Sequence, residues 1–137
     1  MTNVSLSKEQ AEEAENILAK IASDRRISKK LSLVGLLGKW RDLGSAIERG
    51  YEWTIDDYTN DLTTRNFIDA VIERASIPLK SDVEQMLKPL DDDFISNTLP
   101  VVGTLPGVGV DKKWWHRIPK KLVGDLKEDV EGLGLVG

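Results

Sequence analysis

Apolar residues recur at intervals of three and four positions along most of this 137-residue chain. That spacing gathers them on one face of an α-helix, because a helix completes a turn about every 3.6 residues. No stretch alternates apolar and polar residues for long enough to predict a half-buried β-strand. The pattern therefore predicts an all-α protein, with four to five helices in a bundle or an orthogonal array.

The length and composition favour a single domain over residues 1–137, with its own hydrophobic core. Hydrophobic residues make up 40% of the chain and charged residues 31%, a composition too apolar for intrinsic disorder. The chain contains no cysteine and one histidine, which excludes disulfides, thiolate nucleophiles, zinc fingers, iron–sulfur clusters and sites built on two imidazoles. We accordingly expect no metal ion and no cofactor.

No apolar run approaches the ~20 residues needed to cross a membrane. The stretch from Met1 to Ser7 also lacks the basic and apolar regions of a secretion signal. We therefore expect a soluble, cytoplasmic protein that does not associate with a membrane. Its small net charge of −4 hides opposed acidic and basic blocks, which form the candidate binding surfaces.

Local capping signals predict where the helices begin. Residues 7–10 (Ser-Lys-Glu-Gln) and 81–84 (Ser-Asp-Val-Glu) each form a capping box, in which two side chains satisfy free backbone N–H groups. Thr54 and Ser28 are further cap candidates. The predicted helices cover residues 8–23, 29–49, 55–75, 82–96 and 119–131. The second has an unusually wide apolar stripe, which favours a central position in the bundle.

Glycines and prolines predict where these helices end or bend. Gly50 supplies a left-handed residue that ends the second helix. Pro78 closes the third, because the residue before a proline avoids helical dihedrals. Pro89 lies inside the fourth and is expected to kink or split it. Three glycines inside the second helix predict the close approach of a neighbouring helix: Gly35, Gly38 and Gly44.

An apolar strap rich in proline and glycine, residues 98–113, precedes the last predicted helix. From Thr98 to Val110 it contains no charged residue. A solvated linker would be polar, so we expect this strap to lie extended against the bundle. The last helix then begins at Pro119, because proline is tolerated in the first turn of a helix.

Trp53 lies in an acidic stretch that contains no basic residue, with Glu52, Asp56, Asp57 and Asp61. Asp57 and Asp61 share a helix face, where like charges repel, so the stretch predicts an acidic and aromatic surface for a basic partner. A structural explanation competes with this interpretation. In it, Asp56 and Asp57 stabilise the N-terminus of the helix. Asp61 would then pair with Arg65 one turn further on.

Three consecutive aspartates, Asp91–Asp93, are reminiscent of a metal site but lack its other elements. No second acidic cluster lies at a spacing that would complete a cage. A calcium loop also needs alternating oxygen ligands, a central glycine and a final glutamate. We therefore predict a solvated face beyond Pro89 rather than a metal site.

Residues 112–121 are the most unusual ten in the chain, because cations and tryptophans are interleaved in them. The side chains concerned are Lys112, Lys113, Trp114, Trp115, His116, Arg117, Lys120 and Lys121. Tryptophan and arginine concentrate binding energy at protein interfaces, so this stretch is a second candidate partner surface. It also has the composition of a nucleic-acid or phosphate site. Alternatively, one or both tryptophans fill the core and leave the cations in solvent.

No catalytic motif accompanies these stretches. His116 is the only imidazole, and the sequence has no G-x-S-x-G nucleophile elbow. Gly103, Gly107 and Gly109 lack the Lys-Ser/Thr ending of a P-loop and the third glycine of a dinucleotide turn. An enzyme centred on His116 is a third hypothesis, which requires a carboxylate or hydroxyl group within hydrogen-bond reach in a concave pocket.

A pattern spread over residues 40–121 provides a resemblance. It comprises Trp40 to Gly50-Tyr51, then Asp56-Asp57-Tyr58-Thr59-Asn60-Asp61-Leu62-x-x-Arg65, and finally Trp114-Trp115-His116-Arg117-x-Pro119. This pattern resembles small bacterial helical proteins that have no established function. The resemblance implies a bacterial origin and indicates no particular activity.

These observations favour a non-enzymatic helical module that binds an unidentified protein partner. An immunity- or antitoxin-like inhibitor of a basic toxin is one concrete version of it. The expected partner-binding residues are Trp53, Asp56, Asp57, Asp61, Trp114, Trp115, His116 and Arg117. The alternative, disfavoured by the net acidity of the chain, is nucleic-acid or phosphate binding through Lys112, Lys113, Arg117, Lys120 and Lys121.

Overall fold

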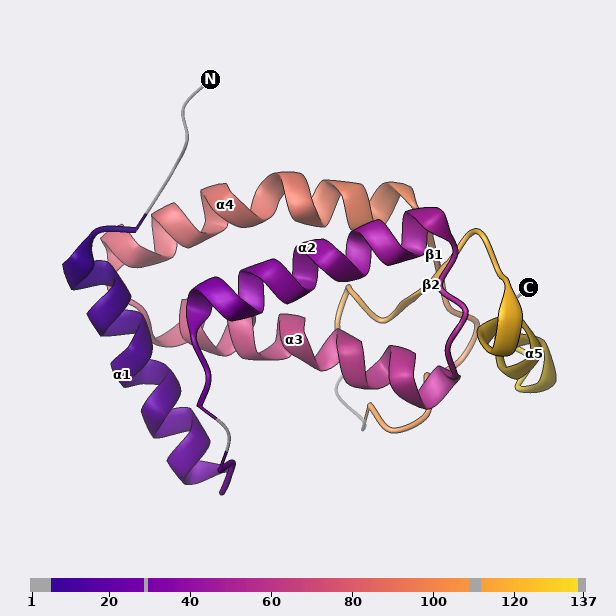
Figure 1. Ribbon diagram of the computed structural model, residues 1–137, viewed down its shortest axis with the longest axis horizontal. Coiled ribbons are helices and arrows are strands. Elements are labelled where there is room, and N and C mark those ends of the chain that lie inside the picture. The colour runs from indigo at the N-terminus through magenta and orange to yellow at the C-terminus, as the bar shows by residue number, and fades with distance from the viewer. Residues whose placement is uncertain (1–5, 29, 109–111, 136–137) are drawn as a thin grey trace.

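The computed structural model describes residues 6–28, 30–108 and 112–135 and shows a mostly helical chain (Figure 1). The described residues form five helices and one pair of short strands, which confirms the predicted all-α class. The elements in chain order are α1 (Lys8–Asp24), α2 (Leu33–Arg49), α3 (Ile55–Arg74), α4 (Ile77–Ser96), β1 (Thr98–Pro100), β2 (Arg117–Pro119) and α5 (Gly124–Gly132).

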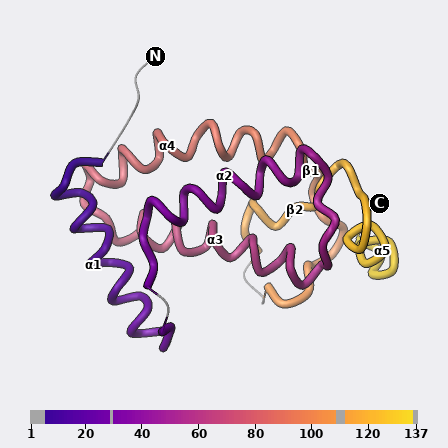
Figure 2. The backbone as a smooth tube through the Cα atoms, viewed as in Figure 1, coloured from indigo at the N-terminus to yellow at the C-terminus, as the bar shows by residue number. Residues whose placement is uncertain are grey.

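Helices α2, α3 and α4 run side by side, and each contacts the other two. Their directions alternate, so α3 runs opposite to α2 and α4 (Figure 2). Helix α1 crosses one end of this group, while α5 and the strands lie toward the opposite end (Figure 1). The turn between α2 and α3 lies beside α5, where the N–H of Asp125 donates to the carbonyl of Glu52 at 3.0 Å.

Large apolar side chains from α1, α2, α3, α4, β2 and the strap fill the core. The rings of Trp40 and Phe94 pack with their centroids 4.7 Å apart. The largest fully buried side chains are Trp40, Tyr58, Phe94, Leu18, Ile21, Ile47, Leu62, Ile68, Leu79, Leu87, Leu105 and Ile118. Burial of one leucine or phenylalanine side chain contributes about 1.5–3 kcal/mol, so these side chains together stabilise the fold strongly.

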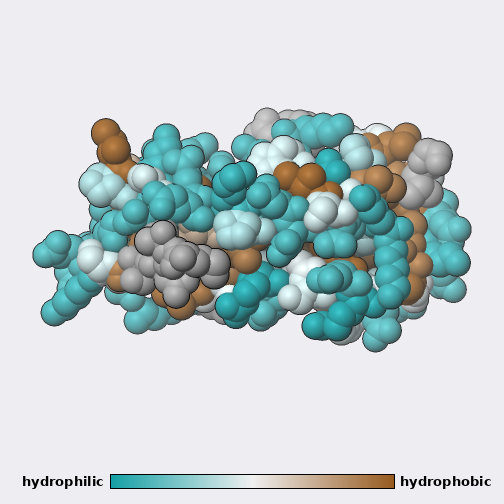
Figure 3. All heavy atoms as spheres, turned by 90° about the horizontal axis from the view of Figure 1, so that it is seen from above, coloured by the Kyte–Doolittle hydropathy of each residue, from teal (hydrophilic) through white to brown (hydrophobic). Residues whose placement is uncertain are grey.

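The surface is largely hydrophilic on the face that Figure 3 shows. Apolar atoms on that face form separate patches rather than one continuous area. Scattered exposure of this kind is usual for a folded protein and marks no binding site by itself. Within the described part of the chain, no helix is both long enough and apolar enough to cross a membrane.

The capping box predicted at the first helix and the Thr54 cap predicted at the third are present. Ser7 Oγ accepts from the N–H of Gln10 at 3.1 Å, and the Gln10 side chain accepts from the N–H of Ser7 at 2.9 Å. Thr54 and Asp57 form the same reciprocal pair at the start of α3. Gly50 ends α2 with a φ of +116°, which side-chain-bearing residues rarely adopt.

Helix α2 begins later than predicted. Ser32, rather than Ser28, is its cap, and Ser32 Oγ accepts from the N–H of Gly35 at 3.1 Å. Ser32 has the extended backbone, with φ −132° and ψ 147°, that a capping residue needs. Residue 29, where the helix was predicted to start, lies outside the described residues.

The glycines inside α2 do not meet a neighbouring helix, so that expectation is wrong. A Cβ added at Gly44 would have no atom of another segment within 4 Å. At Gly38 it would approach only the Arg41 side chain of the same helix, at 3.9 Å. At Gly35 it would lie 2.8 Å from the oxygen of the cap, Ser32. A side chain at position 35 would therefore collide with the cap at the start of its own helix, and no neighbouring helix is involved.

Helix α4 begins at Ile77, five residues before its predicted start. Pro78 fits in its first turn, where the missing N–H removes no helical hydrogen bond. The N–H and hydroxyl of Ser76 donate to the carboxylate of Glu13 in α1 at 2.6 and 2.7 Å. The start of α4 is thus fixed by α1, and residues 81–84 lie inside the helix rather than forming its cap.

Helix α4 is not split at its internal proline. It continues past Pro89 to Ser96, although this proline cannot donate a backbone hydrogen bond to the carbonyl of Gln85. Pro89 and Gln85 are both exposed, so water can bind that carbonyl. Exposure therefore limits the cost of placing a proline inside this helix.

Strand β1 lies in the predicted strap, and strand β2 includes Pro119, the predicted first residue of the last helix. Strands β1 and β2 pair antiparallel, with Thr98 opposite Pro119. Pro119 thus ends a strand, which a two-stranded ribbon tolerates because both strands are edges, and the last helix begins at Gly124. Leu105 of the strap is buried, and residues 109–111 of the strap lie outside the described residues.

Candidate partner-binding groove

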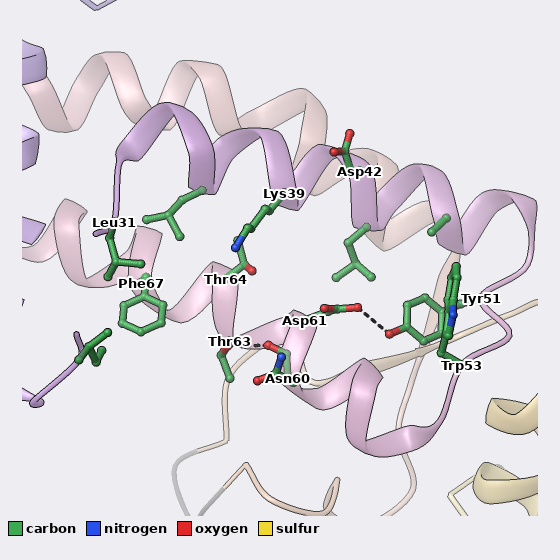
Figure 4. A pocket seen from close by; sticks show the side chains of 14 residues that line it. Leu31, Lys39, Asp42, Tyr51, Trp53, Asn60, Asp61, Thr63, Thr64 and Phe67 are labelled. Atoms are coloured by element: carbon green, nitrogen blue, oxygen red, sulfur yellow. Dashed lines mark hydrogen bonds between the residues drawn. The ribbon is translucent and has the colours of Figure 1, made fainter. Parts of the chain in front are cut away.

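A groove with a volume of about 480 Å³ lies between α2 and α3 (Figure 4). Its lining comes from the segment before α2, from α2, from the α2–α3 turn and from α3. The lining residues are Ile27, Leu31, Leu36, Lys39, Asp42, Leu43, Ala46, Tyr51, Trp53, Asn60, Asp61, Thr63, Thr64 and Phe67. The groove therefore exists only once these segments have packed together.

The apolar part of the groove lies along α2 and at one end, whereas Lys39, Asn60, Thr63 and Thr64 make part of the lining polar. Leu36 and Leu43 of α2 are buried there. Leu31 and Phe67 are half-buried, so part of their apolar surface can still contact a ligand. The guanidinium of Arg25 lies 5.5 Å from the centroid of the Phe67 ring and places a positive charge at this end.

The other end of the groove, which we call the acidic-aromatic end, consists of Tyr51, Trp53 and Asp61 (Figure 4). The hydroxyl of Tyr51 donates to Oδ2 of Asp61 at 2.6 Å. The rings of Tyr51 and Trp53 pack edge to face, with their centroids 5.2 Å apart. Tyr51 is 2% exposed and Trp53 is 53% exposed. Tyr51 thus anchors this end, and Trp53 presents its indole to solvent.

The short turn between α2 and α3 sets this geometry. Gly50 ends α2 and Thr54 caps α3, so residues 51–53 alone connect the two helices. The ring of Tyr51 also packs edge to face on the buried Tyr58, with 5.2 Å between centroids. The turn therefore directs Tyr51 into the protein and leaves the next aromatic residue at the rim.

The Tyr51 hydroxyl remains protonated at neutral pH. Burial raises the pKa of Tyr51 far above its ordinary value of 10.0, and the hydrogen bond to Asp61 raises it further. The negative charges of Asp61 and Asp57 act in the same direction. Tyr51 is therefore the donor to the Asp61 carboxylate, and the acidic field at this end extends to Asp57 in the first turn of α3.

The residues of the predicted acidic surface fall into two groups. Trp53 and Asp61 line the groove. Asp56 and Asp57 are exposed in the first turn of α3 and are not part of the groove lining. Asp57 completes the capping box with Thr54, so its side chain has a structural role at the helix start.

Arg65 pairs with Asp91 of α4 rather than with the predicted Asp61. Its Nε and Nη2 donate to the two carboxylate oxygens of Asp91 at 3.2 and 3.1 Å. Nε1 of Trp40 donates to the same carboxylate at 2.9 Å. The prediction of a solvated face is therefore wrong for Asp91, although the next two aspartates are exposed. No cluster suited to a metal ion occurs among the described residues.

The two tryptophans of the basic stretch lie against Arg65. Trp115 is buried, and its Nε1 donates to Oδ1 of Asn66 at 2.7 Å, which makes it a core residue. Trp114 is 44% exposed. The guanidinium of Arg65 lies 4.9 Å from the centroid of the Trp115 ring and 5.5 Å from that of Trp114. Both rings therefore contribute cation–π contacts to a buried charge.

His116 is buried, and its Nδ1 accepts from the N–H of Lys113 at 3.2 Å. Burial lowers the pKa of His116, and the charges of Lys113 and Lys112 lower it further, so the ring is neutral near pH 7. His116 lines a cavity of about 280 Å³ together with Leu105. The described residues give its ring no hydrogen bond to a carboxylate or hydroxyl group, as an enzyme centred on His116 would require.

Two of the basic residues at 112–121 form hydrogen bonds within the protein. Nε and Nη2 of Arg117 donate to the hydroxyl and carbonyl oxygens of Thr98 at 2.8 and 3.0 Å. Nζ of Lys121 donates to the carbonyl of Arg49 at the end of α2, at 3.0 Å. The other lysines of the stretch are exposed or half-buried. Arg117 and Lys121 therefore hold the segment around β2 against β1 and α2.

Sequence reasoning did not identify Tyr51 or the apolar part of the groove. The wide apolar stripe of the second helix was a signal for it, because Leu36 and Leu43 on that stripe line the groove. Comparisons of the chain with protein-family models, curated protein sequences and solved structures find no match in any of the three. The chemistry of the groove is therefore the basis for assigning a function.

Proposed function

We propose that this protein is an interaction module that binds a segment of a partner protein in the groove between α2 and α3. The observation that carries the proposal is Trp53, which is 53% exposed at the end of a groove lined by both apolar and polar side chains. Tryptophan and tyrosine are enriched among the residues that contribute most binding energy at protein interfaces. Because Tyr51 holds Trp53 in place, less conformational entropy is lost when a partner binds.

The groove is elongated, which favours a chain segment over a compact small molecule. Its lining includes Ile27 and Leu31 before α2, and Tyr51 and Trp53 after it. Helix α2 contains 17 residues. At 1.5 Å per residue, a helix of that size is roughly 25 Å long. A helical or extended segment can span this distance and place several side chains in one groove.

The charges of the acidic-aromatic end favour a basic partner. Among the described lining residues, Asp42 and Asp61 are acidic and Lys39 is basic, and Asp42 pairs with Arg41 at 3.7 Å. Asp57 adds negative charge beside the acidic-aromatic end. An immunity- or antitoxin-like inhibitor of a basic toxin is the specific role we propose, because complementary charge accelerates encounter and selects the partner.

Selection of peptides against a blocked groove tests this proposal. Thr63 is an exposed lining residue of α3, so Thr63→Trp would fill the groove without opening the core. Ser45→Trp is the matched control, because Ser45 is exposed on α2 but is not part of the lining. Random peptides displayed on phage would be selected on the wild-type protein and then measured against both variants.

We expect the selected peptides to bind the Ser45→Trp variant like the wild type. Binding to the Thr63→Trp variant should be at least about tenfold weaker, because the bulky side chain occupies the central contact region. Thermal unfolding of both variants would establish that they are folded. The proposal fails if no peptide is enriched, or if the enriched peptides bind the Thr63→Trp variant as well as the control.

A further inference from the structure

We infer that the acidic-aromatic end binds an arginine side chain of the partner segment, stacked on Trp53 and hydrogen-bonded to Asp61. This inference rests on the proposed function, since the groove as a whole holds the segment and this end selects one of its residues. It goes further by naming the chemical group that is recognised and the end of the groove that holds it.

Asp61 supplies a carboxylate in a fixed orientation. Its Oδ2 accepts from the hydroxyl of Tyr51 at 2.6 Å, and Tyr51 is buried. An ionised carboxylate has about four acceptor positions on its two oxygens, so Asp61 retains capacity for further donors. A guanidinium is a suitable donor, because its parallel N–H groups match the carboxylate oxygens.

Trp53 supplies an aromatic surface at the same end of the groove, next to Tyr51. Its ring packs edge to face with Tyr51, whose hydroxyl contacts Asp61, so the three side chains form one connected unit. Tryptophan provides the strongest aromatic site for a cation, and arginine is its more frequent partner in proteins. Trp53 is also the most exposed of these three residues, which leaves indole surface available to a ligand.

The local charge disfavours an anionic ligand at this end. The acidic residues there are Asp61 and the neighbouring Asp57, whose charges both act on the Tyr51 hydroxyl. On the α2 side, Asp42 is paired with Arg41 at 3.7 Å, so the negative charge of this end comes from Asp61 and Asp57. A partner carboxylate or phosphate would be repelled by this field, whereas a cation is attracted.

The opposite end of the groove determines which part of the segment lies there. The guanidinium of Arg25 lies over the ring of Phe67 and repels a second cation. Leu31 and Phe67 leave apolar surface available there. The partner segment therefore carries its arginine at the acidic-aromatic end and apolar residues toward Phe67.

Arginine fits this site better than lysine does. Its planar guanidinium can stack on the indole of Trp53 while its edge donates to Asp61. The lysine ammonium is a compact, strongly hydrated charge and cannot make both contacts with one flat group. The pairing of an exposed indole with an oriented carboxylate is thus the feature that discriminates between the two cations.

Chemical variants of a groove-dependent peptide test the inference. In the peptide, arginine would be replaced by citrulline, which keeps the shape without the charge, and separately by lysine. Fluorescence anisotropy would give the Kd of each labelled peptide for the wild type and for the Asp61→Asn, Trp53→Ala and Ser45→Trp variants. Asp61→Asn keeps an amide oxygen that can accept from Tyr51, so the turn retains its hydrogen bond.

We expect citrulline to weaken binding to the wild type about tenfold, since it removes a charge-assisted and a cation–π contact. In the Asp61→Asn variant the arginine–citrulline difference should shrink to about twofold. In the Trp53→Ala variant the preference for arginine over lysine should largely disappear. The Ser45→Trp variant should reproduce the wild-type differences.

Failure of the inference is distinguishable from failure of the proposed function. If peptides need the open groove but lack arginine, or bind equally well with citrulline, the inference is overturned and the interaction groove remains. If the arginine–citrulline difference is unchanged in the Asp61→Asn variant, the assignment of this end is likewise overturned. If no peptide depends on the open groove, both the proposed function and the inference fail.

Discussion

Arg65 and Asp91 form a two-point ion pair that ties α3 to α4, with Nε–Oδ1 and Nη2–Oδ2 distances of 3.2 and 3.1 Å. Arg65 is 6% exposed, and the ring of Trp115 lies 4.9 Å from its guanidinium. A charge at this depth is tolerated only with a partner, because the loss of hydration must be compensated. The pair therefore fixes the packing of two helices rather than presenting charge to solvent.

Replacing Asp91 by alanine should destabilise the protein by about 3 kcal/mol. The substitution removes both charge-assisted hydrogen bonds of the buried Arg65, which keeps only a contact of 3.8 Å with Asp69, and it removes the acceptor of the Trp40 indole N–H. Urea unfolding followed by circular dichroism measures the change. Asp92→Ala is the matched control, since Asp92 pairs with Lys88 at the exposed surface and should contribute less than about 0.5 kcal/mol. Equal effects of the two substitutions would contradict this role of Asp91.

Replacing Tyr58 by phenylalanine should lower the free energy of unfolding by about 1–2 kcal/mol. The buried hydroxyl of Tyr58 donates to the carbonyl of Arg117 at 2.7 Å. Without this hydroxyl, the carbonyl of Arg117 in β2 loses its hydrogen bond to Tyr58. The ring itself remains, and the core keeps its volume. Urea unfolding at neutral pH measures the effect, and unchanged stability would show that this contact does not hold β2 to α3.

Nucleic-acid binding by residues 112–121 is the alternative function, and we expect it to be absent. The guanidinium of Arg117 is held by Thr98, and Trp115 is buried, so two groups that would contact a nucleic acid are used internally. A mobility-shift measurement with single-stranded DNA at about 50 mM salt is a sensitive check, because phosphate contacts strengthen at low salt. A shift that Lys120→Gln with Lys121→Gln abolishes would support the alternative instead.

Local signals predicted the features of the fold that depend on residues within one turn. The capping box of Ser7 and Gln10 is such a feature, because its two partners lie three positions apart. Pro78 shows where local signals stop, since a proline can follow one helix or begin the next. The choice here depends on Glu13, which binds Ser76 from 63 positions away and fixes the start of α4.

Only those residues of the candidate site that stand out by type in the sequence were predicted. Trp53 and Asp61 were identified because a tryptophan in an acidic stretch is distinctive in any sequence. Tyr51 was not identified, because its role comes from burial and from a hydrogen bond that forms after the helices pack. Leu36 and Leu43 looked like ordinary core residues, since helical spacing does not show that a groove remains beside them.

His116 should make stability decline in mild acid. Burial lowers its pKa in the folded protein below the ordinary 6.5, so the unfolded chain binds a proton more readily. The contribution of neutral His116 to the free energy of unfolding is therefore complete above pH 6.5 and is lost as the pH falls below that value. His116→Asn keeps an acceptor for the Lys113 N–H but does not titrate. Between about pH 7 and pH 5, urea unfolding should show a smaller loss of stability for this variant. Parallel curves for the two proteins would contradict the prediction.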